Sequence, residues 1–237
     1  KIAAGEVVER PASVVKELME NSIDAGATSI TVEIAEGGTS VIKITDNGKG
    51  IPKDEIRTAF MRHATSKIDS FEDLENVLTL GFRGEALSSI ASVAQVEMLT
   101  RTENDSMGTR IVINGGVVDR EEECAANVGT VFYVKNIFFN TPARRKFLKK
   151  PATEGSYISE IVNRIALGHP NIAIKYVNNG NIVLQTNGDG NVKNSLFYIY
   201  GKDIASKMLS LESEKDGYIL KGLVGKPELS RGNRNYE

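Results

Sequence analysis

The chain has 237 residues, of which 41% are hydrophobic and 25% charged, a composition that can bury a core and excludes a mainly disordered chain. Lysine and arginine total 29 against 31 acidic residues, so the net charge of −2 excludes a global attraction to nucleic acid or anionic membranes. No apolar stretch approaches the ~20 residues that cross a bilayer and no export signal opens the chain, so we expect neither insertion nor secretion.

A helix and a hairpin are predicted in the first fifty residues. Pro11 suits the first turn of a helix, and the apolar residues that follow recur at helical spacing over 12–24. Alternating apolar residues then predict a strand over 30–34, a turn at 36–38 and a second strand over 41–46. We expect the two strands to pair.

The remaining pattern predicts a sheet interrupted by helices. We expect helices over 54–63, 85–93 and 155–167, strands over 95–101, 109–114 and 130–135, and two short strands near 172–186. The remainder of the chain should contain another helix and a strand near 218–224. The glycine-rich segment 187–191 cannot build a core and is the best linker candidate. We therefore expect one domain over 1–188 and the beginning of a second, truncated domain over 189–237. Both ends of the chain look cut, so we expect a fragment.

Glu17 and Asn21 are the first candidate site residues. They lie four positions apart and therefore project from the same side of the predicted helix, beside its apolar stripe. A carboxylate there can take a proton from water, and an amide oxygen can hold a hard cation. The alternative is that both residues lie on a solvated helix face. When only these two residues are considered, the solvated face is the favoured interpretation.

Asp46 changes that balance, because the two-residue strand period places it on the same face as Ile42 and Ile44. An unpaired buried carboxylate costs roughly several kcal/mol, so a hydrogen-bonding ligand such as the exocyclic amino group of adenine is a fitting partner. A cap for the following turn is the alternative. In that turn Gly48 and Gly50 permit close ligand approach. A dinucleotide fingerprint is absent, since no full GxGxxG occurs between a strand and a helix.

Phosphate-binding features follow further along the chain. Arg83 and Gly84 belong to a glycine-bounded loop that leads into a predicted helix, whose free N–H groups favour anions. Lys67 follows two hydroxyl residues, and Thr130 marks a tight strand entry. Each of these features is common by itself, but their order along one chain is not.

Six segments carry a specific family resemblance: ELMEN, SIDAGAT, DNGKGI, HATSKI, GFRGEAL and NTPARRKFL. They resemble the amino-terminal ATPase region of the MutL family of DNA mismatch-repair proteins, within the superfamily of gyrase, heat-shock chaperone and histidine-kinase ATP sites. The resemblance is nearly continuous from residue 1 to about 150 and continues in later segments. It implies an α+β fold, a two-layer sandwich of helices on a mixed, mainly antiparallel sheet. The ATP-binding domain would span 1–188, and an α/β transducer domain would begin at 189.

The resemblance also implies a role for each candidate residue. Glu17 would be the general base for water that attacks the γ-phosphate, Asn21 the magnesium ligand, and Asp46 the adenine reader. Gly48 and Gly50 would shape the adenine pocket.

The other candidates would lie around the phosphates and the base. Lys67 would approach the phosphates, Arg83 and Gly84 would lie in a lid that closes over them, and Thr130 would support hydrogen bonds on the adenine side. The implied cofactors are ATP and Mg²⁺.

The implied activity is ATP hydrolysis coupled to dimerisation. ATP would drive two such regions together as a homo- or heterodimer, and slow hydrolysis would couple mismatch recognition to strand removal. The implied partners are a mismatch-recognition protein, DNA, and a processivity clamp, nuclease or helicase, with no membrane. Relatives also use a lysine downstream of this chain and dimer contacts upstream of it, so we expect the fragment to hydrolyse ATP poorly.

We expect a cytoplasmic, nucleoid-associated protein in bacteria, or a nuclear one if the source is eukaryotic. The single cysteine, Cys124, suits a reducing compartment because it cannot form an intrachain disulfide. One cysteine and two scattered histidines, His63 and His169, make a zinc site improbable.

A basic cluster remains outside these assignments: Arg144, Arg145, Lys146, Lys149 and Lys150, around Phe147 and Leu148. It could contact DNA phosphates, but a solvated face or a loop near the nucleotide is favoured, because runs of charge usually lie on the surface. Two other functional classes stay in view. A histidine-kinase catalytic domain lacks an upstream phosphoacceptor helix here, and a non-enzymatic DNA-binding module would leave Glu17, Asn21 and Asp46 without a role.

Overall fold

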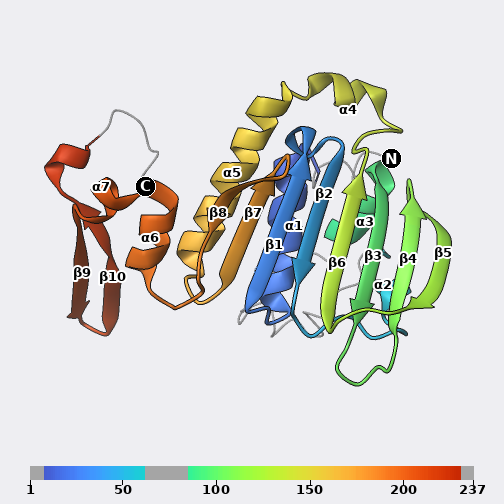
Figure 1. The fold of residues 1–237 in the computed structure, drawn as a ribbon, viewed down its shortest axis with the longest axis horizontal. Coiled ribbons are helices and arrows are strands. Elements are labelled where there is room, and N and C mark those ends of the chain that lie inside the picture. Colours follow the sequence, from blue (N-terminus) through green and yellow to red (C-terminus); the bar gives the residue numbers. More distant parts are fainter. Residues whose placement is uncertain (1–7, 62–84, 231–237) are drawn as a thin grey trace.

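The computed structural model describes residues 8–61 and 85–230. One eight-stranded sheet carries helices on one face, and a separate two-stranded sheet lies at the far side of the molecule (Figure 1). This arrangement agrees with the predicted α+β sandwich. No helix in the described ranges is both long enough and apolar enough to span a bilayer.

The large sheet is mixed but mainly antiparallel, as predicted. Its strands in chain order are β1 (Ser29–Ala35), β2 (Val41–Asp46), β3 (Gln95–Arg101), β4 (Gly108–Asn114), β5 (Val117–Cys124), β6 (Gly129–Lys135), β7 (Ala173–Asn178) and β8 (Asn181–Gln185). Their spatial order is β5-β4-β3-β6-β2-β1-β7-β8. Only the β1–β7 pair is parallel among the described strands.

The helices precede, connect or follow these strands. They are α1 (Pro11–Asp24), the short 3-10 helix η2 (Glu36–Gly38), α2 (Ile56–Ala59), α3 (Ala86–Val93), α4 (Pro142–Phe147), α5 (Pro151–Gly168), α6 (Val192–Tyr200), α7 (Lys202–Ala205) and the 3-10 helix η4 (Pro227–Leu229). The second sheet pairs β9 (Met208–Lys215) with β10 (Tyr218–Gly225). The predicted boundary at 188/189 falls between β8 and α6, and it stays a prediction.

The core lies between the sheet and the helices packed on it, which include α1, α3 and α5. Val14, Val15, Leu18 and Met19 of α1 are buried, as the helical spacing predicted. Every second residue of β2 is also buried, and β2 pairs with β1 through the predicted hairpin. Each such side chain contributes about 1.5–3 kcal/mol by leaving water. We call the helix-bearing side of the sheet the covered face and the other side the open face.

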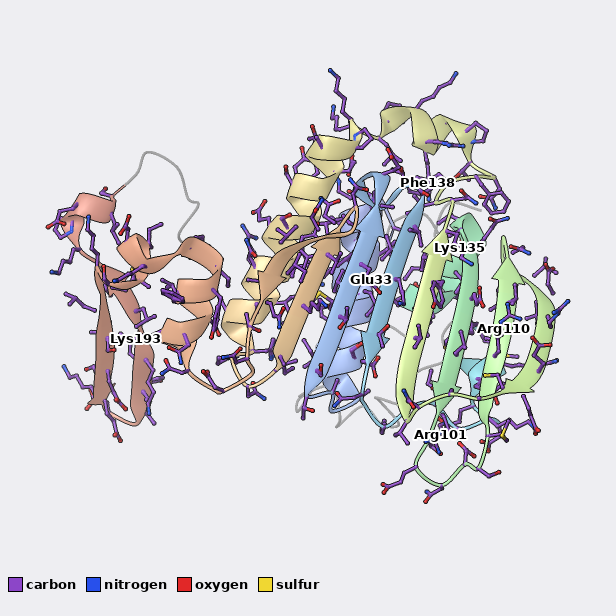
Figure 2. The ribbon with its side chains drawn as sticks, viewed as in Figure 1. Glu33, Arg101, Arg110, Lys135, Phe138 and Lys193 are labelled. Carbon is purple, nitrogen blue, oxygen red and sulfur yellow. The ribbon has the colours of Figure 1, made fainter. Side chains whose placement is uncertain are left out.

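The open face carries an ion-paired row of side chains, which we call the charge ladder. Its members cross the sheet from β1 to β5: Glu33, Lys43, Lys135, Glu97, Arg110 and Glu122. Figure 2 labels Glu33, Lys135 and Arg110 on three different strands. Lys43 and Lys135 also lie over the ring of Tyr133. Within the ladder each cation has an anionic partner.

Several elements differ from the prediction, among them β9, which lies before the strand expected near 218–224. The helix expected over 54–63 is helical only over α2, because Lys53–Glu55 form an exposed turn, and Ile56 is the one buried residue of α2; residues from 62 lie outside the described ranges. Strand β5 was not predicted, because its acidic, exposed sequence lacks an apolar alternation. Helix α4 was not predicted either, because it buries no residue and therefore has no apolar stripe.

Candidate functional site

Asp46 ends β2 on the covered face and is 8% exposed. Its Oδ2 accepts a hydrogen bond from Ser22 Oγ at 2.8 Å, and its Oδ1 accepts one from Gly48 N at 2.9 Å. The bond from Gly48 N caps the following turn, so Asp46 does have the capping role that was the alternative interpretation. No cation forms an ion pair with this carboxylate within residues 8–61 and 85–230.

The surroundings of Asp46 change its acidity. Burial raises the pKa of the carboxyl group above its ordinary value of 3.8, while hydrogen bonds from Gly48, Ser22 and the Thr130 backbone act in the opposite direction. The carboxylate therefore has fixed hydrogen-bond donors but no neutralising charge. A ligand that donates a hydrogen bond would relieve part of this cost.

Helix α1, which carries Glu17 and Asn21, contacts this carboxylate through Ser22. Ser22 follows Asn21 directly and contacts Asp46, so the last turns of α1 lie against the end of β2. Glu17 and Asn21 are half-buried, one turn apart, beside the buried stripe that contains Leu18 and Ser22. Both already have partners in the folded chain, including Lys16 Nζ at 3.6 Å from Glu17 Oε1. This confirms the predicted position at the core edge.

A row of hydroxyl groups continues from Asp46 across the covered face. Strand register pairs Asp46 with Thr130, Thr130 with Thr100, and Thr100 with Thr109. All three threonines are buried. The Oγ1 atoms of Thr100 and Thr130 are 3.1 Å apart, and Thr100 Oγ1 also accepts a hydrogen bond from Ile51 N at 2.9 Å. Thr100 therefore joins Thr130 to the loop that follows Asp46.

Two glycines of that loop are required by close contacts. A Cβ on Gly48 would lie 2.9 Å from Ala25 Cβ, at the C-terminal end of α1. Gly50 has φ +72°, and a Cβ there would lie 2.2 Å from the carbonyl oxygen of Arg101. The loop is therefore packed between α1 and β3, and the two predicted glycines have a structural reason to be glycine.

Asn47 fastens the same loop to the chain before β1. Its Oδ1 accepts hydrogen bonds from the N–H groups of Thr28 and Ser29 at 2.9 and 2.8 Å, and its Nδ2 donates to Thr28 Oγ1. Lys49 N donates to the carbonyl oxygen of Ala25 at 3.0 Å. These bonds hold Asp46 beneath the end of α1.

Sequence reasoning missed Ser22, Asn47 and Thr100. Asn47 had only the signal of a turn, because asparagine before glycine is typical of turns, whereas its observed bonds reach Thr28 and Ser29, 19 and 18 residues earlier. Ser22 and Thr100 had none, since their partners are 24 and 30 residues away. Three predicted site residues, Lys67, Arg83 and Gly84, lie outside the described residues.

The donor set near Asp46 suits a magnesium ion that arrives with its ligand. Within the described ranges no group of three histidine, cysteine or acidic side chains could hold a metal by itself. Mg²⁺ is usually held by one or two protein oxygens together with substrate phosphates and water. The amide oxygen of Asn21 and the carboxylate of Glu17 are two of the side-chain oxygen donors on this part of α1, which also carries Glu20, Ser22 and Asp24.

Comparison with known proteins gives a consistent result. Residues 9–128 match the family described as histidine kinase-, DNA gyrase B- and HSP90-like ATPases. The DNA mismatch repair protein MutL of Agathobacter rectalis is 57% identical over 237 residues, and that of Clostridium botulinum is 52% identical over 235. The alignments cover 100% and 99% of this chain but 37% and 35% of those proteins. The chain thus spans just over a third of their length.

A solved structure extends the likeness to three dimensions. The Aquifex aeolicus MutL ATPase domain complexed with ADP superposes with a TM-score of 0.76 and 30% sequence identity. The match covers 96% of this chain and 80% of that one. That structure has the same α+β architecture, and the ADP belongs to it.

Proposed function

The chain belongs to the MutL family of DNA mismatch repair proteins and contains its histidine kinase-, gyrase- and HSP90-like ATPase domain, and from this membership we propose that it binds ATP with Mg²⁺ beside Asp46. The observation that carries the proposal is the buried Asp46 carboxylate, which has hydrogen-bond donors on both oxygens and no ion-pair partner in the described ranges.

Asp46 is the proposed adenine reader. Its carboxylate accepts a hydrogen bond from the exocyclic amino group, while Ser22 and Gly48 hold it in place. Thr130 and Thr100 extend the polar edge beside it, so a base hydrogen-bonds to this row and packs against the loop of Gly48 and Gly50. This arrangement supports recognition of a flat base that carries an amino group.

Asn21 and Glu17 are the proposed residues on the phosphate side. Asn21 supplies an amide oxygen ligand to the metal, and Glu17 accepts a proton from the attacking water as general base. A bound Mg²⁺ neutralises charge on the phosphate oxygens. The single helical turn between the two side chains keeps the proton acceptor next to the metal ligand.

Lys67, Arg83 and Gly84 complete the proposal as phosphate-contacting and lid residues, by the family pattern alone. For the intact protein we propose ATP-driven dimerisation, slow hydrolysis to ADP and phosphate, and coupling of mismatch recognition to strand removal. The proposed partners are a second copy or a related chain, a mismatch-recognition protein, DNA, and a clamp, nuclease or helicase. The proposed location is the cytoplasm, at the nucleoid, in keeping with the bacterial relatives.

Calorimetric titration of ATP tests the phosphate side of this site. In the presence of Mg²⁺ we expect Asn21→Ala to weaken binding by about tenfold or more, and in EDTA we expect little difference from wild type. The matched control is Asn163→Ala, which truncates a half-buried asparagine of α5 far from Asp46 along the chain. Equal affinities of the Asn21 and Asn163 variants with Mg²⁺ would remove Asn21 from the metal site.

A further inference from the structure

The basic cluster has a surface and a position that the ATP site does not account for. Helix α4 buries none of its residues, and Phe147 at its end is 82% exposed. Four of the five cations are exposed and the fifth, Arg144, is half-buried. We propose that α4 and residues 148–150, which we call the α4 patch, bind a single DNA strand through its phosphates and one stacked base.

The first support is that acidic side chains of the described residues do not neutralise the cations of the α4 patch. None of the five cations of the α4 patch forms an ion pair with an acidic side chain in residues 8–61 or 85–230. Lys43, Lys135 and Arg110 of the charge ladder, by contrast, are all paired. A concentrated positive field in a protein of net charge −2 favours an anionic partner at this place.

The second support is the exposed ring. Phe147 leaves 82% of its surface in water, so it packs little against the residues that the structure describes. Cations that contact the backbone, together with an aromatic ring that stacks on a base, are the common means of binding single-stranded nucleic acid. Lys146 precedes Phe147, and Lys149 follows two residues later, so phosphates on both sides of a stacked base find a cation. An acidic protein segment would use the charges but not the ring.

The third support is that α4 is held in place from both ends. Before it, Phe138 N donates to the carbonyl oxygen of Val93 at 2.7 Å, and Asn140 Nδ2 donates to that of Ser92 at 2.8 Å. After it, Lys149 N donates to Oε1 of Glu154, a carboxylate that is 1% exposed. Glu154 therefore orders the backbone of the patch without neutralising its side chains, and the patch is pre-organised for a partner.

The α4 patch lies far from Asp46, the base-binding end of the proposed nucleotide site. Thr130 pairs with Asp46 at one end of β6, and Lys135 pairs with Val41 at the other, which separates them by about 17 Å at the usual rise of a strand. Helix α4 follows beyond Lys135, at the opposite end of the sheet from Asp46 (Figure 1). This position argues against the interpretation of the basic cluster as a loop near the nucleotide, which the sequence left open. The inference rests on the proposed function only for the choice of DNA as partner.

Fluorescence anisotropy with a labelled single-stranded oligonucleotide, without nucleotide, tests the proposal. The decisive variant is the double charge reversal Arg145→Glu with Lys146→Glu, and its control is Lys202→Glu with Lys215→Glu. The control changes the net charge equally, at exposed lysines without an ion pair in the described ranges. We expect the first variant to bind at least about tenfold more weakly than the control and to have a salt slope about 1.4 smaller than wild type, from two lost phosphate contacts.

A second variant tests the ring. Phe147→Ala should weaken binding of the single strand by roughly 5- to 100-fold and leave binding of a duplex of the same length nearly unchanged, because paired bases cannot stack on the ring. Calorimetric titration with ATP should give wild-type affinity for both α4 variants, which separates this proposal from the ATP site. The proposal is wrong if the two double reversals bind the strand equally, if the wild type binds none at low salt, or if polyglutamate displaces an equimolar strand completely.

Discussion

Asp46 and Glu97 are two carboxylates of one sheet that lie on opposite faces and in opposite environments. Asp46 ends β2 on the covered face, where Ser22 and Gly48 donate hydrogen bonds to it and no cation in the described ranges pairs with it. Glu97 lies within β3 on the open face, where Lys135 Nζ and Arg110 Nε contact it at 3.0 and 2.8 Å.

The pKa values of the two groups move in opposite directions. Burial raises the pKa of Asp46 above 3.8, and its hydrogen bonds only partly oppose this. Burial also acts to raise the pKa of Glu97, but the hydrogen bonds and charges of Lys135 and Arg110 outweigh it and hold that pKa below 4.5. The charge of Glu97 is therefore satisfied within the sheet. The charge of Asp46 is not, which is the condition expected of a ligand-binding group.

The largest effect should come from the loop that follows Asp46. Gly50→Ala places a Cβ 2.2 Å from the carbonyl oxygen of Arg101, so we expect it to lower the free energy of unfolding by about 3–5 kcal/mol. Gly190→Ala is the matched control, since Gly190 has φ +75° against +72° for Gly50 but nothing within 4 Å of its Cβ. The control should cost about 1 kcal/mol. Urea unfolding measures both, and equal losses would show that Gly50 is not tightly packed.

Removal of the hydroxyl that holds Asp46 should have an intermediate effect. Ser22→Ala leaves Oδ2 of Asp46 buried with one donor fewer, and we expect a loss of about 1–3 kcal/mol in the free energy of unfolding. Ser92→Ala is the control, because among the described residues Ser92 Oγ donates only to the carbonyl oxygen of Ser89, within its own helix. That variant should stay within about 0.5 kcal/mol of wild type. A Ser22 variant as stable as the control would mean that Asp46 does not depend on this bond.

Neutralising Glu97 should cost less. Glu97→Gln removes one charge from the ladder, and we expect a loss of about 0.5 kcal/mol near neutral pH, as for other surface ion pairs. Because the folded-state pKa is lowered, this stabilisation is present above pH 4.5 and disappears as the pH falls through the folded value. Unfolding of wild type and variant across this range should converge in acid. A difference that persists there would assign the effect to packing.

Neutralising Asp46 should change the free energy of unfolding in the opposite direction, so that the variant is the more stable protein. A raised folded-state pKa means that the folded protein binds the proton more tightly, so wild type loses stability as the pH rises from 3.8 through the folded value. Asp46→Asn does not titrate, and its amide can still accept from Gly48 N. We expect this variant to gain stability over wild type with rising pH, most clearly at neutral pH. A variant that is less stable at neutral pH and converges with wild type in acid would contradict the pKa direction.

Periodicity found the elements that present the site. The stripe that ends near Ile23 and the alternation that ends at Asp46 depend on neighbours in sequence, so α1 and the β1–β2 hairpin were predicted with nearly their observed bounds. The contacts of Asp46 with Ser22 and of Thr130 with Thr100 depend on packing between distant segments, and no local pattern encodes them. Strand β5 was missed because pairing with β4, rather than apolar burial, stabilises it.

The central claim is that Asp46 reads the amino group of adenine, and a nucleotide comparison tests it most directly. Inosine triphosphate carries a carbonyl oxygen where ATP carries that amino group. We would titrate both into wild type, Asp46→Asn and Glu97→Gln by calorimetry. We expect wild type and the Glu97 variant to prefer ATP by about 100-fold or more, because the carboxylate accepts from the amino group and repels the carbonyl. In Asp46→Asn the preference should vanish or invert, since the amide can donate to that carbonyl. An unchanged preference for ATP in this variant would contradict the claim.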